Sequence, residues 1–373
     1  GHGRLPGEVG SELSEGEIGE EGYTDAGPFC SDGPRLDEFL AEMRREVFEG
    51  REGYMNVGEA PGITPERNEF ITNPAHKELD MLFLFDHVGV DQEGSKWNTV
   101  PFEVKNLRAR LADQQEAVKN AGWASLFFCN HDQPRVVSRW GNDTDRESRE
   151  LSAKAFGMLL HMHRGTPYIY EGEELGMTNA HFTKLDQYRD LEAINAYRQR
   201  VEEAKCQSAE SMMAALALIG RDNARTPMQW DASRYAGFTA PDAATEPWIG
   251  VNPNHVEINA AEEFDDPGSV YSFYKKLIAM RHNNATIATG ECNLVAADSE
   301  QVYSFTRTSG DDTILVIVNL TDRTAQVPAE VAQLLEDGVG ESQVLLSTYD
   351  AVHSVKSVAR GELARWEGVV IQL

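Results

Sequence analysis

The chain has 373 residues, of which 41% are hydrophobic and 25% charged, and this composition excludes an intrinsically disordered protein. Its 61 acidic residues outnumber the 34 lysines and arginines, and the formal net charge of −27 disfavours nucleic acid and anionic membranes as partners. No apolar run reaches the roughly 18–20 residues of a membrane helix, and the start lacks the apolar block of a signal peptide, so we predict a cytoplasmic protein.

The first 33 residues are rich in glycine and glutamate and show little apolar periodicity. Such a composition buries too little apolar surface to order a chain, so we predict an irregular acidic leader over residues 1–33. The cysteines are far apart, which favours reduced thiols over a zinc knuckle or a disulfide framework. They are Cys30, Cys129, Cys206 and Cys292. We predict no cofactor and no metal site in this chain.

Glu59 ends the first predicted strand. Residues 54–59 read as a short strand, and residues 60–62 (APG) then force a turn, because proline and glycine cannot continue a strand ladder. An amphipathic helix precedes this strand, with an apolar stripe between residues 36 and 47. Catalytic groups of α/β barrels lie at the carboxyl ends of the strands, so Glu59 is the leading candidate for an acid/base.

Three further strands alternate with helices after Glu59. They are predicted at residues 79–85, 123–129 and 165–171. The first two are continuous apolar runs, as expected for strands buried on both faces of a sheet. Four such strand–helix units imply a parallel sheet with right-handed crossovers, so the fold class is α/β. The strand at 123–129 delivers His131 and Asp132 at its carboxyl end.

The rest of the chain changes character twice. Residues 182–220 predict a polar helical hairpin, and residues 221–230 form a loop dense in hydrogen-bonding groups, a type of loop that often binds ligands. An amphipathic helix at about 270–281 ends the α/β region. Beyond it, short strands separated by turn signals predict a small antiparallel β domain. The clearest of these strands are at residues 301–307, 313–320 and 369–373.

Four segments in this order and spacing carry a specific resemblance. They are residues 57–62 (VGEAPG), 130–135 (NHDQPR), 165–174 (GTPYIYEGEE) and 221–231 (RDNARTPMQWD). Together they resemble the α-glucosidase branch of the α-amylase-type glycoside hydrolases, which includes oligo-1,6-glucosidase, dextran glucosidase, trehalose-6-phosphate hydrolase and the sucrose isomerases. The resemblance implies the C-terminal half of a (β/α)8 TIM-type barrel, strands five to eight, over residues 34–285. An antiparallel β-sandwich domain over residues 286–373 would follow.

The resemblance also implies a role for four residues. Glu59 would be the general acid/base, and Asp132 would be the carboxylate that steadies the distorted sugar. His131 would bind sugar hydroxyls at the cleavage subsite, and Arg221 would hold the far edge of the terminal glucose. The implied activity is that of an exo-acting, retaining α-glucosidase of short, neutral α-glucosides. Retaining glycosidases need a protonated carboxyl and an ionised one about 5 Å apart.

The second carboxyl is where the chain departs from the family. The family's nucleophilic aspartate follows a Gly-Phe-Arg motif at the end of the fourth strand, and no such segment precedes Glu59. Asp25 and Asp32 lack that context. The first four barrel strands and the metal-binding loop of some relatives are also not found. We therefore expect a truncated chain that is inactive alone, and linkage specificity stays open, as does hydrolysis against transglycosylation or isomerisation.

Other interpretations compete with these roles. The chain could be a catalytically dead scaffold or partner subunit, or its parent a trehalose-6-phosphate hydrolase or sucrose isomerase. Asp132 could merely cap a turn, and Arg221 and Arg225 could pair with the nearby Asp222 and Asp231. An incomplete barrel would leave sheet edges unpaired, which predicts self-association.

Two tryptophans have open roles. Trp97 and Trp230 could form sugar-stacking platforms, or they could fill the core, as large aromatic side chains usually do.

Overall fold

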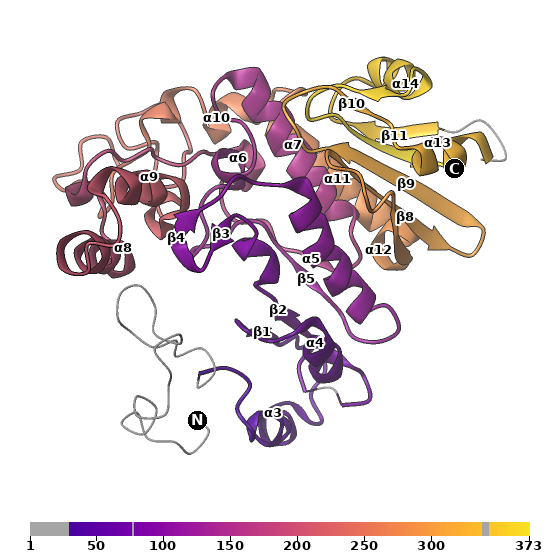
Figure 1. Cartoon of the computed structure of the whole chain (residues 1–373), viewed down its shortest axis with the longest axis horizontal. Helices are drawn as coiled ribbons and strands as arrows, with labels where there is room; N and C mark the ends of the chain where they lie inside the picture. Colours follow the sequence, from indigo (N-terminus) through magenta and orange to yellow (C-terminus); the bar gives the residue numbers. More distant parts are fainter. Residues whose placement is uncertain (1–29, 77, 338–342) are drawn as a thin grey trace.

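The computed structural model describes residues 30–76, 78–337 and 343–373, so the predicted leader lies almost wholly outside the described residues. The parallel strands extend from the middle of the molecule toward its lower edge, with a helical lobe at the upper left and an antiparallel C-terminal sheet at the upper right (Figure 1). None of the described helices is long and apolar enough to cross a membrane.

The parallel sheet has four short strands. They are β1 (Val57–Glu59), β2 (Met81–Phe83), β5 (Ser125–Leu126) and β6 (Thr166–Pro167). β1 pairs with β2 and β5 with β6, and a single parallel bridge between Leu82 and Ala124 joins the two pairs. The spatial order is therefore β1–β2–β5–β6, which is also the chain order. All four predicted strands are confirmed, but they are shorter than predicted, because a ladder extends only where a neighbour's backbone is in reach.

Helices connect and cover these strands. They are α3 (Leu36–Met43) with the π-helix η2 (Arg44–Phe48), α4 (Pro65–Thr72), the 3-10 turn η3 (Asp86–Gly89), α5 (Val104–Ala117), α6 (Val136–Arg139), α7 (Arg146–Met162), the 3-10 turn η4 (Glu173–Leu175), α10 (Ala260–Glu263), α11 (Val270–Asn283) and α12 (Ala285–Thr289). α7 begins where the Asp145 side chain accepts a hydrogen bond from the Ser148 N–H. Most of its residues are buried, because it lies between the parallel strands and the C-terminal sheet (Figure 1).

The helical lobe follows β6. It contains α8 (Leu191–Tyr197), the π-helix η6 (Arg198–Glu203), α9 (Ala209–Ile219) and three 3-10 turns, η5 (Leu185–Gln187), η7 (Arg221–Asn223) and η8 (Pro253–Val256). A hairpin that was not predicted, β3 (Gln92–Glu93) with β4 (Ser95–Thr99), packs on this lobe. Its Trp97 is only 7% exposed and shares a core with Tyr188 and Leu216. Trp97 is therefore a core residue, which is the usual role of a large aromatic side chain and the alternative to a sugar platform.

The C-terminal part contains a five-stranded antiparallel sheet, in the order β11–β13–β9–β8–β7. The strands are β7 (Glu291–Val295), β8 (Val302–Ser309), β9 (Asp312–Asn319), β11 (Gln343–Ser347) and β13 (Gly368–Gln372). One face packs on α7, and the other is covered by a ribbon and by helices. These covering elements are β10 (Ala325–Gln326) with β12 (Glu362–Leu363), α13 (Ala329–Asp337) and α14 (Ala351–Ala359). The predicted antiparallel C-terminal β domain is thus confirmed, and its second layer is the two-stranded β10–β12 sheet together with α13 and α14.

Candidate active site

A cavity of about 320 Å³ opens at the carboxyl ends of the four parallel strands. Its wall is mainly aromatic: Phe83 lies edge-on to Phe127 at 5.3 Å and to Tyr168 at 4.5 Å between ring centroids. Glu59 and His131 also line it, one from the end of β1 and one from the segment after β5. An apolar cavity with a few convergent polar groups is the usual form of a small-molecule site.

Glu59 is placed by the close packing of β1 on β2. A Cβ at Gly58 would lie 2.5 Å from Leu82 Cδ2 and 2.7 Å from Leu79 Cδ1, so a larger residue here would displace these two buried leucine side chains. The chain then turns at Gly62, whose φ of +79° suits glycine. The Glu59 side chain is exposed and makes no hydrogen bond or ion pair with any described residue. Its predicted position at a strand's carboxyl end is confirmed.

Asp132 lies in a turn that Asn130 organises. The Asn130 side-chain oxygen accepts the Asp132 N–H at 2.7 Å, and the Asn130 carbonyl accepts the Gln133 N–H at 3.3 Å. The turn is therefore capped by Asn130, and the interpretation of Asp132 as its cap is wrong. The Asp132 carboxylate is 30% exposed, and its Oδ2 lies 3.8 Å from His131 Nε2.

Two arginines hold Asp132 from the other side. Arg225 Nη2 donates to Asp132 Oδ1 at 2.6 Å, and Arg225 Nε donates to the His131 carbonyl at 2.8 Å. Arg221 Nη1 lies 3.6 Å from the same Asp132 oxygen. Arg225 thus fixes the backbone of His131 and the carboxylate of Asp132 with one planar group.

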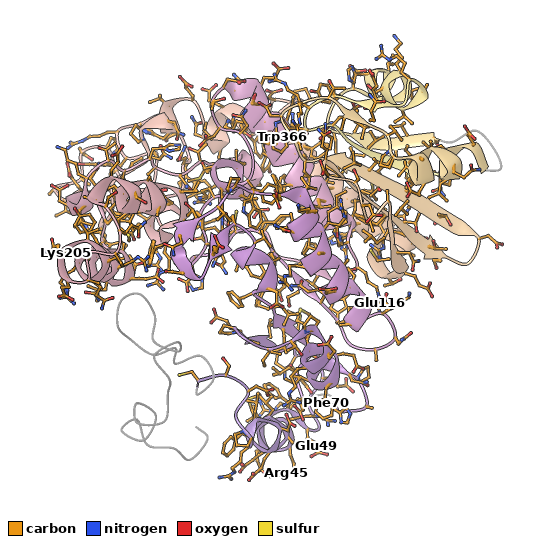
Figure 2. All side chains as sticks on the ribbon, viewed as in Figure 1. Arg45, Glu49, Phe70, Glu116, Lys205 and Trp366 are labelled. Carbon is orange, nitrogen blue, oxygen red and sulfur yellow. The ribbon has the colours of Figure 1, made fainter. Side chains whose placement is uncertain are left out.

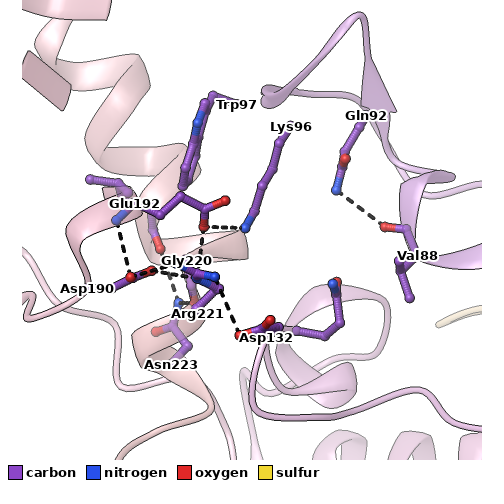
Figure 3. A network of polar contacts seen from close by, with 12 residues as sticks. Val88, Gln92, Lys96, Trp97, Asp132, Asp190, Glu192, Gly220, Arg221 and Asn223 are labelled. Carbon is purple, nitrogen blue, oxygen red and sulfur yellow. Dashed lines mark hydrogen bonds and ion pairs between the residues drawn. The ribbon is translucent and has the colours of Figure 1, made fainter. Parts of the chain in front are cut away.

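Arg221 belongs to a network of ion pairs beside the cavity (Figure 3). Its Nε and Nη2 donate to the two oxygens of Asp190 at 2.7 and 2.8 Å, which is the bidentate geometry that guanidinium groups favour. Glu192 Oε2 lies 3.1 Å from Arg221 Nε and accepts a hydrogen bond from Lys96 Nζ at 2.7 Å. Burial opposes ionisation of Asp190, but the hydrogen bonds from Arg221 and from the Glu192 N–H, together with the charges of Arg221 and Arg225, outweigh it and hold the pKa of Asp190 below its ordinary value.

The alternative in which these arginines pair with Asp222 and Asp231 does not hold among the described residues. Asp222 instead accepts the backbone N–H groups of Arg189 and Asp190, at 2.6 and 2.9 Å, and Asp231 accepts the N–H of Ser233 at 2.8 Å. The two aspartates that lie near these arginines in the sequence therefore accept hydrogen bonds from backbone N–H groups.

Sequence reasoning missed three members of the network, Lys96, Asp190 and Glu192. Asp190 does carry a local signal, because it precedes α8 and its side chain accepts the Glu192 N–H at 3.2 Å as a helix cap. That signal predicts the start of a helix and says nothing of a distant arginine.

A buried layer lies behind the cavity. The Glu173 carboxyl accepts a hydrogen bond from Tyr274 Oη at 2.9 Å, and burial raises the pKa of Glu173 to about 7. Burial also raises the pKa of the Cys129 thiol, which lines the cavity, well above its ordinary value. Glu173 is 4% exposed and is not among the described residues that line the cavity, so its contacts are structural.

Trp230 is 52% exposed and is not among the described residues that line the cavity. Its role as a sugar platform stays a prediction.

Comparison with known proteins gives consistent matches to one family. A family model described as the alpha-amylase catalytic domain matches residues 8–290. The oligo-1,6-glucosidase of Parageobacillus thermoglucosidasius is 40% identical over 367 residues, which are 97% of this chain and 62% of that protein. The crystal structure of trehalose-6-phosphate hydrolase from Bacillus licheniformis has a TM-score of 0.81 at 37% identity, and the match covers 97% of this chain and 61% of that one.

A trehalulose synthase variant also has a TM-score of 0.81, at 34% identity, covering 97% of this chain and 62% of that one. The chain therefore spans about three fifths of the length of each of these relatives.

Proposed function

Because the chain belongs to the α-amylase family of glycoside hydrolases, we propose that it carries the acid/base half of the active site of an exo-acting, retaining α-glucosidase. The family assignment makes the parallel strands part of a TIM-type barrel and the last sheet an antiparallel C-terminal domain. We propose further that β1, β2, β5 and β6 are strands five to eight of that barrel.

The convergence of Glu59, His131 and Asp132 at the ends of two strands carries this proposal. Glu59 and His131 line one aromatic cavity. Asp132 lies beside His131 and forms ion pairs with two arginines. The residues are far apart in the sequence, and the sheet brings them to one edge. That edge is where barrel enzymes place catalytic groups.

Each residue has a role that its surroundings suit. Glu59, whose side chain has no partner among the described residues, donates a proton to the leaving oxygen and takes one from water in the second step. Asp132 accepts hydrogen bonds from ring hydroxyls and offsets the positive charge of the oxocarbenium-like transition state. His131 adds a hydrogen bond to the same sugar. Arg221, held rigidly by Asp190, bounds the sugar on the side away from the cleaved bond.

The charges beside the cavity favour an unphosphorylated substrate. Three cations, Lys96, Arg221 and Arg225, are each paired with a carboxylate of Asp132, Asp190 or Glu192. A phosphate would have to compete with these carboxylates for every cation in the group. Short neutral α-glucosides are therefore a better fit than the phosphorylated sugar named for one relative.

The covalent step needs a second carboxylate. Among the described residues that line the cavity, Glu59 is the one acidic residue. We therefore expect the 373 residues to be inactive alone and the nucleophile to come from a segment outside them. The same observation favours the alternative of a catalytically inactive scaffold or partner subunit.

A fusion protein separates these two functions. The segment of the Parageobacillus relative that precedes its match is joined ahead of this chain, and hydrolysis of p-nitrophenyl-α-glucoside is measured. We expect activity, and we expect Glu59→Gln to lower the rate by roughly 10²–10⁴-fold through loss of the general acid. Glu49→Gln is the matched control, because Glu49 is an exposed glutamate at the outer end of η2 (Figure 2). Equal turnover in the Glu59→Gln fusion would refute the assignment, and an inactive fusion would favour the scaffold.

Two further expectations belong to this proposal. The four cysteines carry free thiols, as is usual in the reducing cytoplasm, where we expect the protein to act. We also expect copies of the chain to self-associate through the open edges of β1 and β6 when no other strand covers them.

A further inference from the structure

Arg135 is a buried cation close to the candidate active site. It follows Asp132 by three positions and is 1% exposed. Among the described residues, no carboxylate lies within ion-pair distance of its guanidinium group, and its Nε has no hydrogen-bond partner. A buried charge without an opposite charge costs stability, so the presence of an arginine here calls for a function that an apolar residue would not perform.

The guanidinium group joins two loops through their backbone carbonyls. Its Nη1 donates to the Glu171 carbonyl, in the segment after β6, and its Nη2 donates to the Ala224 carbonyl at 3.3 Å, in the loop after α9. Only a planar group with several donors can reach two such acceptors at once. Arg135 therefore connects the turn of Asp132 to two segments that are distant in the sequence.

Tyr170 reaches the same Ala224 carbonyl. Its Oη donates to that oxygen at 3.1 Å, and its ring centroid lies 5.1 Å from the guanidinium carbon of Arg135. Burial raises the pKa of Tyr170, so the hydroxyl stays protonated and remains a donor. A carbonyl has two lone pairs, and Tyr170 and Arg135 together use both. Tyr170 also lines the cavity of the candidate active site, so this anchor lies in the cavity wall.

Ala224 lies at the centre of the loop that holds Asp132. It is fully buried, stands directly before Arg225, and its N–H donates to the Arg221 carbonyl at 3.0 Å. Arg225 in turn donates to the Asp132 carboxylate at 2.6 Å. The contacts thus form a closed ring, from Asp132 through Arg225 and Ala224 to Arg135 and back along the backbone. Fixing the planar peptide after Ala224 fixes the point from which the Arg225 side chain starts.

We propose that Arg135 and Tyr170 are positioning residues, which hold Arg225, and through it the Asp132 carboxylate, by fixing the Ala224 carbonyl. The inference rests on the proposed function for the role of Asp132 in the reaction. A carboxylate that stabilises a transition state must be held within about 0.5 Å of its productive position. The two donors to Ala224 supply that precision from outside the set of residues that contact the sugar.

The Arg225 Nε–H reports on this positioning in the 373-residue chain, without any activity. It donates to the His131 carbonyl, so its hydrogen exchange, followed by NMR with isotope-labelled arginine, measures how firmly the side chain is held. The Arg225→Lys variant lacks this signal and so assigns it. Tyr170→Phe removes only the hydroxyl donor and should speed the exchange roughly 2–10-fold, the effect of one hydrogen bond. Arg135→Lys should speed it too, because an amine cannot reach both carbonyls.

Tyr349→Phe is the matched control. Tyr349 Oη also donates to a backbone carbonyl, that of Arg365 at 3.0 Å, but it lies between β11 and α14 in the C-terminal part. Its substitution should leave the exchange of the Arg225 Nε–H unchanged. Thermal unfolding checks that each variant folds, and Tyr170→Phe, which keeps the ring, decides the result if Arg135→Lys does not fold.

A double-mutant cycle in the fusion protein shows whether the positioning serves the reaction. Tyr170→Phe should lower kcat/KM by roughly 2–10-fold. It should have a smaller effect when Arg225 is already lysine, because a residue that acts through Arg225 loses its influence there. A purely structural contribution of Tyr170 would lower kcat/KM by the same factor in both backgrounds, and that result would overturn the inference.

The outcomes separate this inference from the proposed function. Unchanged exchange of the Arg225 Nε–H in Tyr170→Phe, or an equal change in Tyr349→Phe, would overturn the inference even if the fusion protein is active. Faster exchange in Tyr170→Phe alone, together with an inactive fusion protein, would support the anchoring of Arg225 and refute the glucosidase.

Discussion

Arg225 binds Asp132 through one nitrogen, at 2.6 Å, and the carbonyl of the preceding residue through another, at 2.8 Å. One side chain thus sets both the orientation of the carboxylate and the path of the backbone that carries it. Arg225 lies in the loop after α9, and its two acceptors lie in the segment after β5, so these contacts join two distant parts of the chain.

Arg225→Lys should lower the activity of the fusion protein. A lysine keeps the charge but cannot reach both acceptors with a planar fork. Loss of a hydrogen bond to a charged group, about 1.5–3 kcal/mol, corresponds to a fall of about 10–150-fold in kcat/KM. The matched control is Arg234→Lys, because Arg234 is 60% exposed and its contact with Glu246 is long, at 3.7 Å. Equal kcat/KM values in the two variants would show that Asp132 needs no such fixing.

Asp190 has two functions that two substitutions can separate. Asp190→Asn keeps a side chain that caps α8 but loses the charged pair with Arg221. Asp190→Ala loses both, so it should be less stable than Asp190→Asn by about 1 kcal/mol, the usual cost of a helix cap. Urea denaturation of the 373-residue chain measures this difference. If the two variants unfold at the same urea concentration, the cap contributes nothing.

Glu173 should make stability fall as the pH rises. Its pKa is raised to about 7 by burial, against an ordinary value of 4.5, so between these values the folded protein holds a proton that the unfolded chain releases. Stability from this group is complete below pH 4.5 and is lost as the pH rises through 7, at no more than about 1.4 kcal/mol per pH unit.

Urea titrations at several pH values, with Glu173→Gln for comparison, measure this loss. The glutamine is isosteric and uncharged, so its stability curve should be flatter between pH 4.5 and 7. Parallel curves for the two proteins would contradict a buried, protonated Glu173.

Gly58→Ala should destabilise the sheet next to Glu59. The added methyl would meet Leu82 and Leu79 at 2.5 and 2.7 Å, and overpacking of this kind costs about 1–3 kcal/mol. Gly89→Ala is the control, because a Cβ there meets nothing within 4 Å. Denaturant midpoints should shift for the first variant and stay within about 0.5 kcal/mol for the second, as is usual for surface substitutions.

The sequence predicted those parts of the site that rest on local chemistry. Glu59 precedes a proline–glycine turn, and Asp132 follows a continuous apolar run, so both could be assigned to strand ends without a structure. The helices with clear apolar stripes, such as α3 and α11, were predicted for the same reason.

The parts that sequence reasoning missed depend on contacts across the chain. Arg221 pairs with Asp190, which lies 31 positions earlier, because α8 packs beside the loop after α9. Asp222, the neighbour of Arg221 in the sequence, accepts hydrogen bonds from backbone N–H groups instead. Trp97 is buried only because the helical lobe covers the β3–β4 hairpin. The helices over the C-terminal sheet were missed because short strands and short helices give similar apolar patterns there.

The position of α7 has a consequence for how this protein can be divided. The hydrophobic core around α7 includes residues from the α/β region and from the C-terminal region. Among them are Leu107, Phe156, Val316 and Trp366. A truncation of the chain near residue 285 would expose to water the side of α7 that packs on β9 and β13. The C-terminal sheet therefore cannot be exchanged between proteins as an independent domain. The parallel strands, α7 and the final sheet therefore form one structural unit with a shared core.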